Sequence, residues 1–515
     1  MKLPSLFVRK TLVSLLPIKI AIGKKGITCD HPLAAKIGVE ILEKGGNAFD
    51  AAIAVSAALS VVQPHMGGPG GDAFLLGFIG DEVVAYASAG RSPSGFPVED
   101  FMRLNPLYGP LTVTIPGLVY LWGSIHDEHA TLPLEDLLKP AIDLAYKGFY
   151  AGWFLGLASS AYEKDLENYK WAQYFKGIRT GVRVVNREMA STLRLIASRG
   201  YEEFYYGDLA ELLVEELQEQ GVNVGLDDFM EHEGTKLKPL KLEVDGKVLY
   251  ELPPSTQGIT TLQLISALYE LDLYKEPFDS PSKVIKWSKP VKRAYMFRDL
   301  YIGDPDHMNI VPQTYVKYSA METILRDSQL STTREHMSSD TTFFVVSDGE
   351  ALLGLIQSLF YPFGSGLVAR GFPIQNRAVG FTRRKGLPNS PAPKKLPLHT
   401  LSILAISNDR EKYIIGCVGG DYRPQLHLRV YENIFVYKMP IAKAVEAPRF
   451  IYTKFYNTQE VVIEKPLISP QNSDVAKIKS IDNFSAPGHV HAGVLREDKV
   501  ELVNDPRSEG IALAI

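Results

Sequence analysis

Apolar residues recur with helical spacing in the first part of the chain. The segment LAAKIGVEILEK, which follows His31 and Pro32, predicts an amphipathic helix that ends at Gly45 and Gly46. The next segment, FDAAIAVSAALSVV, is apolar on all sides and predicts a buried helix. The glycine-rich stretch HMGGPGGDAFLLGFIG then leads into a strand, and EVVAYASAG predicts a second strand that ends at Arg91.

Helical patterns dominate the middle of the chain. TLPLEDLLKPAIDLAYKGF predicts a helix that is broken at Pro140, because proline removes a backbone donor and clashes with the preceding turn. EMASTLRLIASRG and LAELLVEELQEQG predict two amphipathic helices closed by glycine, and ELPPSTQGITTLQLISALYEL predicts a loop that leads into a helix. Residues 325–340 are polar and without periodicity, which predicts a flexible surface segment.

The last third has the pattern of a β-rich region. TTFFVVSDGEALLGLIQSL contains two β-rich runs on either side of Asp348-Gly349, a strong hairpin signal. Further strands are predicted in TLSILAIS, YIIGCVGG, EVVIEK and KVELVND. The pattern therefore indicates a mixed α and β protein with a helical first part and a strand-rich last part.

Composition narrows the class of protein. The 515 residues are 45% hydrophobic and 22% charged, which excludes disordered, collagenous and coiled-coil chains. The length alone would suggest about three domains. A formal charge of −4 gives no reason to expect nucleic acid as a partner. Cys29 and Cys417 are too few for a disulfide framework.

The N-terminal segment has some features of a signal peptide. However, Arg9 and Lys10 interrupt its apolar run, Pro17 breaks it again, and no cleavage site of small residues follows. We therefore expect residues 1–25 to form an N-terminal arm packed on the protein. No window offers about 18 apolar residues, so we expect no membrane span and a cytoplasmic location.

Most motifs for metal or nucleotide chemistry are missing from the sequence. HExxH, CxxC and EF-hand spacings do not occur, so we predict no metal and no cofactor. His489 and His491 lie on one face of a strand, but without a third ligand they indicate a solvated strand end. GGPGGD lacks the spacing of a phosphate-binding loop, and FGSG around Ser365 is not a GxSxG nucleophile elbow. Thr341, where a polar segment meets a β-rich run, would by itself indicate only the start of a strand.

The order of several other segments makes Thr341 more informative. From about Gly26 onward the sequence resembles the γ-glutamyltranspeptidase family of N-terminal-nucleophile hydrolases. The resemblance rests on these blocks: HPLAAKIGVEILEKGGNAFDAAIA, GGPGGDAFLL, AGRSP, VTIPGLV, PAIDLAYKGF, ELPPSTQG, RDLYIGDPD, DTTFFVVSDGEA, FGSGLV, GCVGGD, EAPRF and NDPRSEG. The resemblance implies an α+β fold, a four-layer αββα sandwich that forms one domain.

The resemblance also implies that the precursor cuts itself between Asp340 and Thr341. The products would be a large subunit, residues 26–340 with the arm, and a small subunit, residues 341–515, which stay together as a heterodimer. A dimer of heterodimers is a further assembly to consider. The freed α-amino group of Thr341, with an ordinary pKa of about 7.7 to 8.0, would act as the base for the hydroxyl of the same residue.

The family pattern assigns further roles to residues of this chain. Gly419 and Gly420 match the oxyanion hole, which needs preorganised backbone donors. Ser358 and Thr342 match hydroxyl residues that support the nucleophile, and Arg91 matches an arginine that binds a substrate carboxylate. The other residues implied in substrate binding are Gln375, Asn376, Arg377, His399, Thr400, Asp421 and Gln425.

The sequence departs from the transpeptidases mainly at positions for substrate recognition. Phe343 replaces a histidine after the cut, Ser92 replaces a glutamate, and Gly380 replaces the aspartate that binds the substrate ammonium. QNRxxxF, PxHT and GGDxxxQ instead resemble the acylase and amidohydrolase branch. The sequence therefore predicts an amide hydrolase for small substrates whose acyl group carries a carboxylate. A γ-glutamyltransferase or glutathione hydrolase and an unprocessed, non-enzymatic binding protein are the alternatives.

Overall fold

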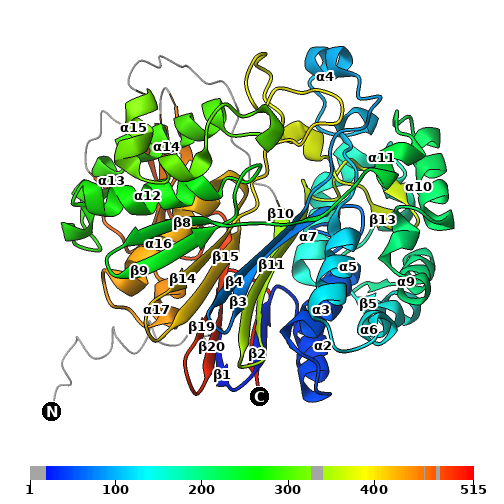
Figure 1. Ribbon diagram of the computed structural model, residues 1–515, viewed down its shortest axis with the longest axis horizontal. Coiled ribbons are helices and arrows are strands. Elements are labelled where there is room, and N and C mark those ends of the chain that lie inside the picture. Colours follow the sequence, from blue (N-terminus) through cyan, green and yellow to red (C-terminus); the bar gives the residue numbers. More distant parts are fainter. Residues whose placement is uncertain (1–18, 326–339, 457–458, 471–475) are drawn as a thin grey trace.

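Two antiparallel sheets lie face to face at the centre of the molecule, and helices cover their outer faces (Figure 1). A computed structural model describes residues 19–325, 340–456, 459–470 and 476–515. The two sheets have seven strands each, in the orders β1-β20-β19-β15-β14-β9-β8 and β21-β2-β10-β11-β3-β4-β7. We call them the β15 sheet and the β10 sheet after their central strands.

The strands of the two sheets come from distant parts of the chain. The β15 sheet contains β1 (Lys19–Gly23), β8 (Leu240–Val244), β9 (Lys247–Glu251), β14 (Ile403–Ser407), β15 (Lys412–Val418), β19 (His489–Leu495) and β20 (Val500–Asn504). The β10 sheet contains β2 (Gly26–Cys29), β3 (Asp72–Ile79), β4 (Glu82–Ser88), β7 (Thr235–Lys236), β10 (Asp340–Ser347), β11 (Ala351–Phe360) and β21 (Ile511–Ala514). Smaller sheets are formed by β5 (Phe149–Tyr150) with β6 (Arg183–Val184), β12 (Val368–Ala369) with β13 (Phe372–Pro373), and β16 (Phe450–Lys454), β17 (Gln459–Glu464) and β18 (Ala476–Ile481).

Each large sheet has its own helical cover. On the β10 sheet lie α2 (Pro32–Glu43), α3 (Ala48–Val62) and α5 (Leu118–His129), with α6 (Leu134–Lys147) and α9 (Arg187–Arg199) packed outside them. On the β15 sheet lie α12 (Gly258–Glu270) and α16 (Arg423–Phe435), with α14 (Ser288–Tyr301) and α15 (Tyr318–Leu325) against α12. The remaining helices are α4 (Val98–Leu104), α7 (Trp153–Leu166), α8 (Trp171–Phe175), α10 (Asp208–Glu219), α11 (Leu226–Met230), α13 (Pro281–Lys286) and α17 (Ile441–Glu446).

Apolar side chains fill all three spaces between these four layers. One cluster joins the β10 sheet to α2, α3, α5 and α6, and a second joins the β15 sheet to α12, α14 and α16. A third cluster lies between the two sheets and includes Phe343, Ile356 and Ile414. Strands buried on both faces account for the nearly continuous apolar runs of β3, β10 and β11. The predicted four-layer αββα sandwich is confirmed.

Local sequence signals explain most of the elements. Helix α3 is buried along its whole length, as its apolar sequence predicts, and it begins with a capping box between Asn47 and Asp50. Strands β10 and β11 form the hairpin predicted at Asp348-Gly349. The predicted arm contributes β1, which pairs with β20 at the edge of the β15 sheet. The flexible segment predicted for 325–340 lies almost entirely outside the described residues.

One prediction about secondary structure is wrong. Helix α6 continues through Pro140 instead of breaking there. Its apolar face is buried against α3 and α9, and tertiary packing of this kind supplies most of the stability of helices in proteins. Packing on this face therefore outweighs the backbone hydrogen bond that the proline removes.

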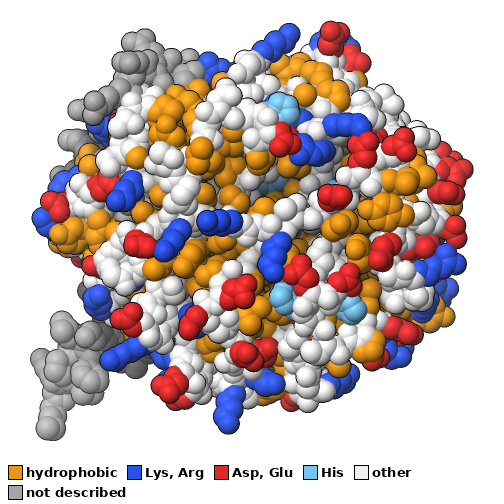
Figure 2. Space-filling view, viewed as in Figure 1, with side chains coloured by type: hydrophobic (Ala, Val, Ile, Leu, Met, Phe, Trp, Pro, Cys, Tyr) orange, Lys and Arg blue, Asp and Glu red, His pale blue; other side chains and the backbone are white. Residues whose placement is uncertain are grey.

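The charges on the surface are distributed as the near-neutral composition indicates. On the face shown in Figure 2, basic and acidic side chains are interspersed, without a large patch of one sign. Among the described residues, no helix combines the length and the apolar character that crossing a bilayer requires. Both cysteines are buried and free.

Phe343 packs between the sheets against a strand that has no side chain at the point of contact. A Cβ atom added to Gly416 of β15 would lie 2.3 Å from the Phe343 ring. The ring is fully buried. Phe343, two residues after Thr341, therefore fills the space that Gly416 leaves open, and it sets the spacing of the sheets at this point of β10.

We expect Gly416→Ala to lower the free energy of unfolding by about 1–3 kcal/mol, because the new methyl group overpacks the contact with Phe343. Urea unfolding in a Thr341→Ala background would measure the change on a full-length chain. Phe343→Leu should rescue part of the loss in the double variant. Gly225→Ala is the control, since a Cβ atom there meets only Asp228 Oδ2 at 4.0 Å. An unchanged midpoint for Gly416→Ala would contradict this account of the packing.

Candidate active site

Thr341 lies at an irregularity in the central ladder of the β10 sheet. Asp340 pairs with Phe360, whereas Thr342 pairs with Gln357, so the register shifts between these two residues. Bulges of this kind redirect side chains and interrupt pairing. The bond between Asp340 and Thr341 therefore lies where the strand departs from a regular ladder, and the Thr341 side chain is fully buried there.

The hydroxyl of Thr341 is held from two sides. Arg423 Nη2 donates a hydrogen bond to Thr341 Oγ1 over 2.6 Å, and the hydroxyl in turn donates to Ser358 Oγ over 3.2 Å. Ser358 Oγ also accepts a hydrogen bond from the backbone N–H of Phe360 over 2.9 Å. The predicted neighbourhood of Thr341 and Ser358 across the hairpin is thus found in the structure.

Arg423, which contacts the Thr341 hydroxyl, is a site residue that the sequence analysis did not name. It begins helix α16, three residues after Gly420, inside the block GGDYRPQ. Its guanidinium is fixed by backbone carbonyls, since Nε donates to Cys417 O over 2.7 Å and Nη1 to Thr400 O over 2.5 Å. An arginine in the glycine-rich block that carries the predicted oxyanion residues was the signal available in the sequence.

Gly419 and Gly420 form the turn between β15 and α16. Gly420 has a φ of 53°, a left-handed conformation that favours glycine. A Cβ atom on Gly419 would lie 2.7 Å from Leu426 Cδ1, so the turn leaves no room for a side chain. Gly419 also lines a cavity of about 280 Å³ together with His489. The turn brings both glycines into the same loop as Arg423, and their role as an oxyanion hole stays a prediction.

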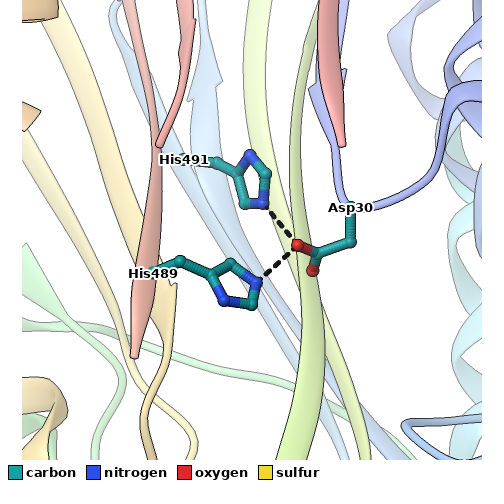
Figure 3. A group of neighbouring side chains, drawn as sticks. All are labelled: Asp30, His489 and His491. Carbon is teal, nitrogen blue, oxygen red and sulfur yellow. Dashed lines mark hydrogen bonds and ion pairs between the residues drawn. The ribbon is translucent and has the colours of Figure 1, made fainter. Parts of the chain in front are cut away.

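Thr342 contacts a buried carboxylate that joins the two sheets. Asp30 follows strand β2 and faces β19 (Figure 3). Its Oδ2 accepts hydrogen bonds from Thr342 Oγ1 over 3.2 Å and from the backbone N–H of Phe343 over 3.1 Å. Its Oδ1 lies 2.6 Å from His489 Nε2 and 2.8 Å from His491 Nε2. The strand that carries Thr341 is therefore tied to the opposite sheet through Asp30.

The interpretation of His489 and His491 as a solvated strand end is wrong. His489 is 6% exposed and His491 is fully buried. The third residue that the sequence did not reveal is Asp30, and among the described residues these three form a group whose ligand atoms lie within 4.8 Å of one another. Such a group could hold a divalent metal. In the structure the two imidazoles instead contact the carboxylate directly.

Electrostatics keeps Asp30 ionised. Burial alone would raise its pKa, but the two histidines and their hydrogen bonds hold the pKa of this carboxyl well below its usual range. Ser508 Oγ adds another donor to Oδ1 over 3.2 Å. A fully buried anion is stable here because several donors surround it.

A second buried polar cluster lies beside Ser358. Asp72 pairs with Ser358 across β3 and β11, and its Oδ1 accepts from Gln375 Nε2 over 2.9 Å and from the backbone N–H of Gly90 over 3.1 Å. Its Oδ2 lies 3.0 Å from His399 Nε2 and 3.8 Å from Arg377 Nε. The structure thus brings three of the predicted substrate residues together around Asp72.

His399 is a neutral member of this cluster. Burial lowers its pKa to about 4, and the charge of Arg377 acts in the same direction. Its ring packs edge-on against Phe74 with the centroids 4.9 Å apart. Arg377 lies over the ring of Phe360, with its guanidinium carbon 4.6 Å from the ring centroid. The guanidinium is therefore the cationic group of this cluster at neutral pH.

Arg91 lies at the wall of a cavity of about 640 Å³. Its Nη1 contacts Asp304 over 2.7 Å and its Nη2 contacts Asp306 over 2.8 Å. Asp304 is fully buried, whereas the side chain of Asp306 is 68% exposed. Phe74 lines the same cavity and contacts His399, so the Asp72 cluster lies behind a residue of the cavity wall.

The other predicted substrate residues contact the protein itself. Asn376 Nδ2 donates to Leu107 O, and Asp421 is paired with Arg298 over 2.6 Å. The amide of Gln425 is matched by the backbone of Tyr452, with contacts of 3.0 Å and 2.9 Å. These contacts give Asn376, Asp421 and Gln425 a structural role, and their roles in substrate binding stay predictions. Thr400 lies beside the site, where its carbonyl accepts from Arg423.

Comparison with known proteins gives the family. The family described as Gamma-glutamyltranspeptidase matches residues 34–515. The chain belongs to this family. It is 30% identical to the Glutathione hydrolase-like YwrD proenzyme of Bacillus subtilis (strain 168), over 96% of this chain and 100% of the relative. It is 28% identical to the Oxamate amidohydrolase proenzyme of Klebsiella pneumoniae, over 94% and 97%.

Solved structures agree with this assignment. The cephalosporin acylase from Bacillus halodurans has a TM-score of 0.84 at 24% identity, covering 96% of this chain and 97% of that chain, which shows a shared fold. Gamma-glutamyltranspeptidase from Pseudomonas nitroreducens has a TM-score of 0.53 at 25% identity, covering 58% and 94%. This chain is a hydrolase of the N-terminal-nucleophile type, as the sequence predicts, and the alternative of a non-enzymatic binding protein is set aside.

We expect Asp30→Asn to lower the free energy of unfolding by about 3 kcal/mol, because it leaves buried donors facing an uncharged amide. The carboxyl ionises well below its usual pKa in the folded protein, so it stabilises the fold above the unfolded pKa, and this contribution is lost only as the pH falls through the folded value. The loss should therefore persist from pH 7 to about pH 4.

Urea unfolding of the Thr341→Ala chain with and without Asp30→Asn tests this expectation at both pH values. Asp81→Asn is the control, since Asp81 forms an exposed ion pair with Lys412, and its removal should leave the midpoint nearly unchanged. Equal midpoints for the Asp30 and Asp81 variants would show that the buried carboxylate does not hold the sheets together.

Proposed function

We propose that this chain is an autoprocessed amide hydrolase in which Thr341 is both nucleophile and base. The observation that carries the proposal is the position of Thr341 Oγ1, held between Arg423 and Ser358 next to a shift in the strand register. Relatives across the family are proenzymes, which supports processing of this chain. Cleavage between Asp340 and Thr341 would leave the two fragments associated, because β10 pairs on both sides with β2 and β11.

The reaction follows from the chemistry of one residue. The hydroxyl oxygen of Thr341 attacks the carbonyl carbon of the substrate amide, and the α-amino group takes the hydroxyl proton. The C–N bond then breaks, the leaving amine receives that proton, and an ester to Thr341 remains. Water hydrolyses the ester and releases the acid. Gly419 and Gly420 are the proposed donors to the oxyanion.

The substrate that the site favours carries a carboxylate on its acyl group. Asp72 is fully buried, its Oδ1 accepts two hydrogen bonds and its Oδ2 faces Arg377 over 3.8 Å, so we do not assign it as the counter-charge for a substrate ammonium. Arg91, by contrast, can exchange its exposed partner Asp306 for a substrate carboxylate while it keeps the buried Asp304. Exposed ion pairs contribute little energy, so this exchange costs little.

A γ-glutamyl compound is the second candidate. The relative from Bacillus subtilis is named glutathione hydrolase-like and is similar over almost the whole of both chains. A γ-glutamyl group also carries a carboxylate that Arg91 could bind. It carries an ammonium group as well, and Gly380 stands where the transpeptidases have the aspartate that binds this group.

Purified wild-type protein should yield fragments of 340 and 175 residues, and the smaller fragment should begin TTFFVV. Thr341→Ala should stay at full length because it lacks the attacking oxygen, whereas Thr341→Ser should still cleave. Denaturing gels and N-terminal sequencing measure both outcomes. A wild-type chain that remains whole after prolonged incubation would refute the proposed function, and cleavage of Thr341→Ala would refute the choice of nucleophile.

Arg91→Gln should raise KM for oxamic or glutaryl amides about tenfold, through loss of the ionic contact with the substrate carboxylate. The KM for a matched substrate with a neutral amide in place of that carboxylate should not change. Arg103→Gln is the control, since Arg103 pairs with Asp100 on an exposed helix. If wild-type enzyme prefers a γ-glutamyl anilide to these substrates by more than about tenfold in kcat/KM, the second candidate replaces the first.

A further inference from the structure

The guanidinium of Arg423 contacts the atom that reacts. Nη2 lies 2.6 Å from Thr341 Oγ1, within the range of strong, charge-assisted hydrogen bonds. The side chain is fully buried. An electrostatic contact at this distance from the nucleophilic oxygen acts on the chemistry itself, in addition to any structural effect.

The direction of this contact is fixed before any substrate binds. Nε donates to the carbonyl of Cys417 at the end of β15, and Nη1 donates to the carbonyl of Thr400. All three nitrogens of the planar group therefore have partners in the structure, and Nη2 is the one that donates to Thr341 Oγ1. Preorganised donors of this kind need no rearrangement when charge develops.

The positive charge of Arg423 also reaches neighbouring groups. Burial and, after it, the charge of Arg423 lower the pKa of His427 to about 3. The same charge contributes to the low pKa of His399, after burial and Arg377. The region around Thr341 Oγ1 thus disfavours added positive charge and favours negative charge.

We propose that Arg423 is a catalytic residue, which stabilises the negative charge that develops on Thr341 Oγ1 both in self-cleavage and in amide hydrolysis. This inference rests on the proposed function. Lysine could not replace the contact fully, because an ammonium lacks the planar set of donors that fixes the guanidinium.

The steps balance without any change in Arg423 itself. In self-cleavage, Thr341 Oγ1 bonds to the carbonyl carbon of Asp340, and the bond from that carbon to Thr341 N breaks. The nitrogen receives the hydroxyl proton, and an ester forms. Water then hydrolyses the ester to the Asp340 carboxylate, the Thr341 hydroxyl and a free amine. Arg423 donates a hydrogen bond throughout and stays protonated, as arginine does in proteins.

The same charge acts on the base after cleavage. The α-amino nitrogen and Oγ1 belong to one residue, so the new amine lies close to the guanidinium. A nearby cation disfavours the ammonium form, which lowers the pKa of the amine below its ordinary value of about 7.7 to 8.0. The amine must be neutral to accept the hydroxyl proton. Its pKa therefore sets the acidic limb of the pH–rate profile, and a lower pKa moves that limb to lower pH.

The test compares Arg423→Gln and Arg423→Lys with wild type in cleavage half-time and in the pH dependence of kcat/KM. We expect Arg423→Gln to slow self-cleavage by about 100-fold, the effect of removing one preorganised donor to developing charge. In the part of the Arg423→Gln protein that does cleave, the acidic limb of the pH–rate profile should move up by about one pH unit. The reason is that the cation that lowers the pKa of the Thr341 amine is gone. Arg423→Lys should also cleave slowly, but its limb should stay near that of wild type.

Arg449→Lys is the matched control, because Arg449 is a buried arginine paired with Asp505. Arg449→Lys should change the free energy of unfolding without moving the acidic limb of the pH–rate profile. If Arg423→Gln fails to fold, titration of the Thr341 amine in processed wild-type enzyme by nitrogen NMR decides the matter. An amine that titrates at or above about 7.7 to 8.0 would overturn the inference.

The inference about Arg423 would also be overturned by a folded Arg423→Gln protein that cleaves at the wild-type rate and keeps the wild-type acidic limb of the pH–rate profile. That result leaves the proposed function intact, because the wild type would still cleave and hydrolyse amides. A wild-type chain that never cleaves would instead refute the proposed function.

Discussion

The buried carboxylate of Asp30 joins the two sheets next to β10, the strand that carries Thr341, and the geometry of the site depends on this carboxylate. Asp30 follows β2 in one sheet and contacts His489 and His491 on β19 of the other sheet. Its second oxygen binds Thr342 and the backbone of Phe343. Ionisation is possible because donors surround the group on both sides. The position of Thr341 is thus fixed relative to both sheets, although Thr341 does not itself contact Asp30.

The packing beside Asp30 also fixes the position of Thr341 relative to both sheets. Phe343 fills the space over Gly416, so the central strands β10 and β15 approach closely at this point. The turn after β15 carries Gly419 and Gly420, and Arg423 follows it. Close packing of the sheets therefore brings a loop of one sheet to the hydroxyl of the other. A larger residue at Gly416 would separate the Thr341 hydroxyl from the loop that carries Gly419, Gly420 and Arg423, and the proposed chemistry requires these groups to meet.

The sequence was informative wherever the signal was local. The hairpin at Asp348-Gly349 predicts that Ser358 lies across from Thr341, and the structure shows this contact. Contacts between distant segments could not be predicted in this way. Arg423 is 82 positions from Thr341, and Asp30 is 312 positions from Thr342. The alternation of a strand shows that His489 and His491 share a face, but it does not show that another layer covers that face.

At Pro140 a local sequence signal was present but gave the wrong prediction. Its local rule is sound, since proline does remove a helical hydrogen bond, but the burial of the helix face against α3 and α9 decides the outcome. Among site residues, family motifs named Gln375, Arg377 and His399 as substrate residues, and the structure brings these three together around Asp72, while their role in binding stays a prediction. The motifs did not reveal Asp72, whose partners become apparent only when β3, β11 and the loop before β14 come together.

In the proposed mechanism the two arginines have different roles, Arg91 in substrate binding and Arg423 in catalysis. Arg91 is partly exposed at a cavity wall and has one partner that it can release. Arg423 is fully buried and held by the carbonyls of Cys417 and Thr400, with its Nη2 at Thr341 Oγ1. A substrate carboxylate therefore meets a cation that can adapt, whereas the nucleophile meets one that cannot. An interaction that strengthens only as charge develops on Thr341 Oγ1 lowers the barrier, while an equal contact with bound substrate and transition state would not.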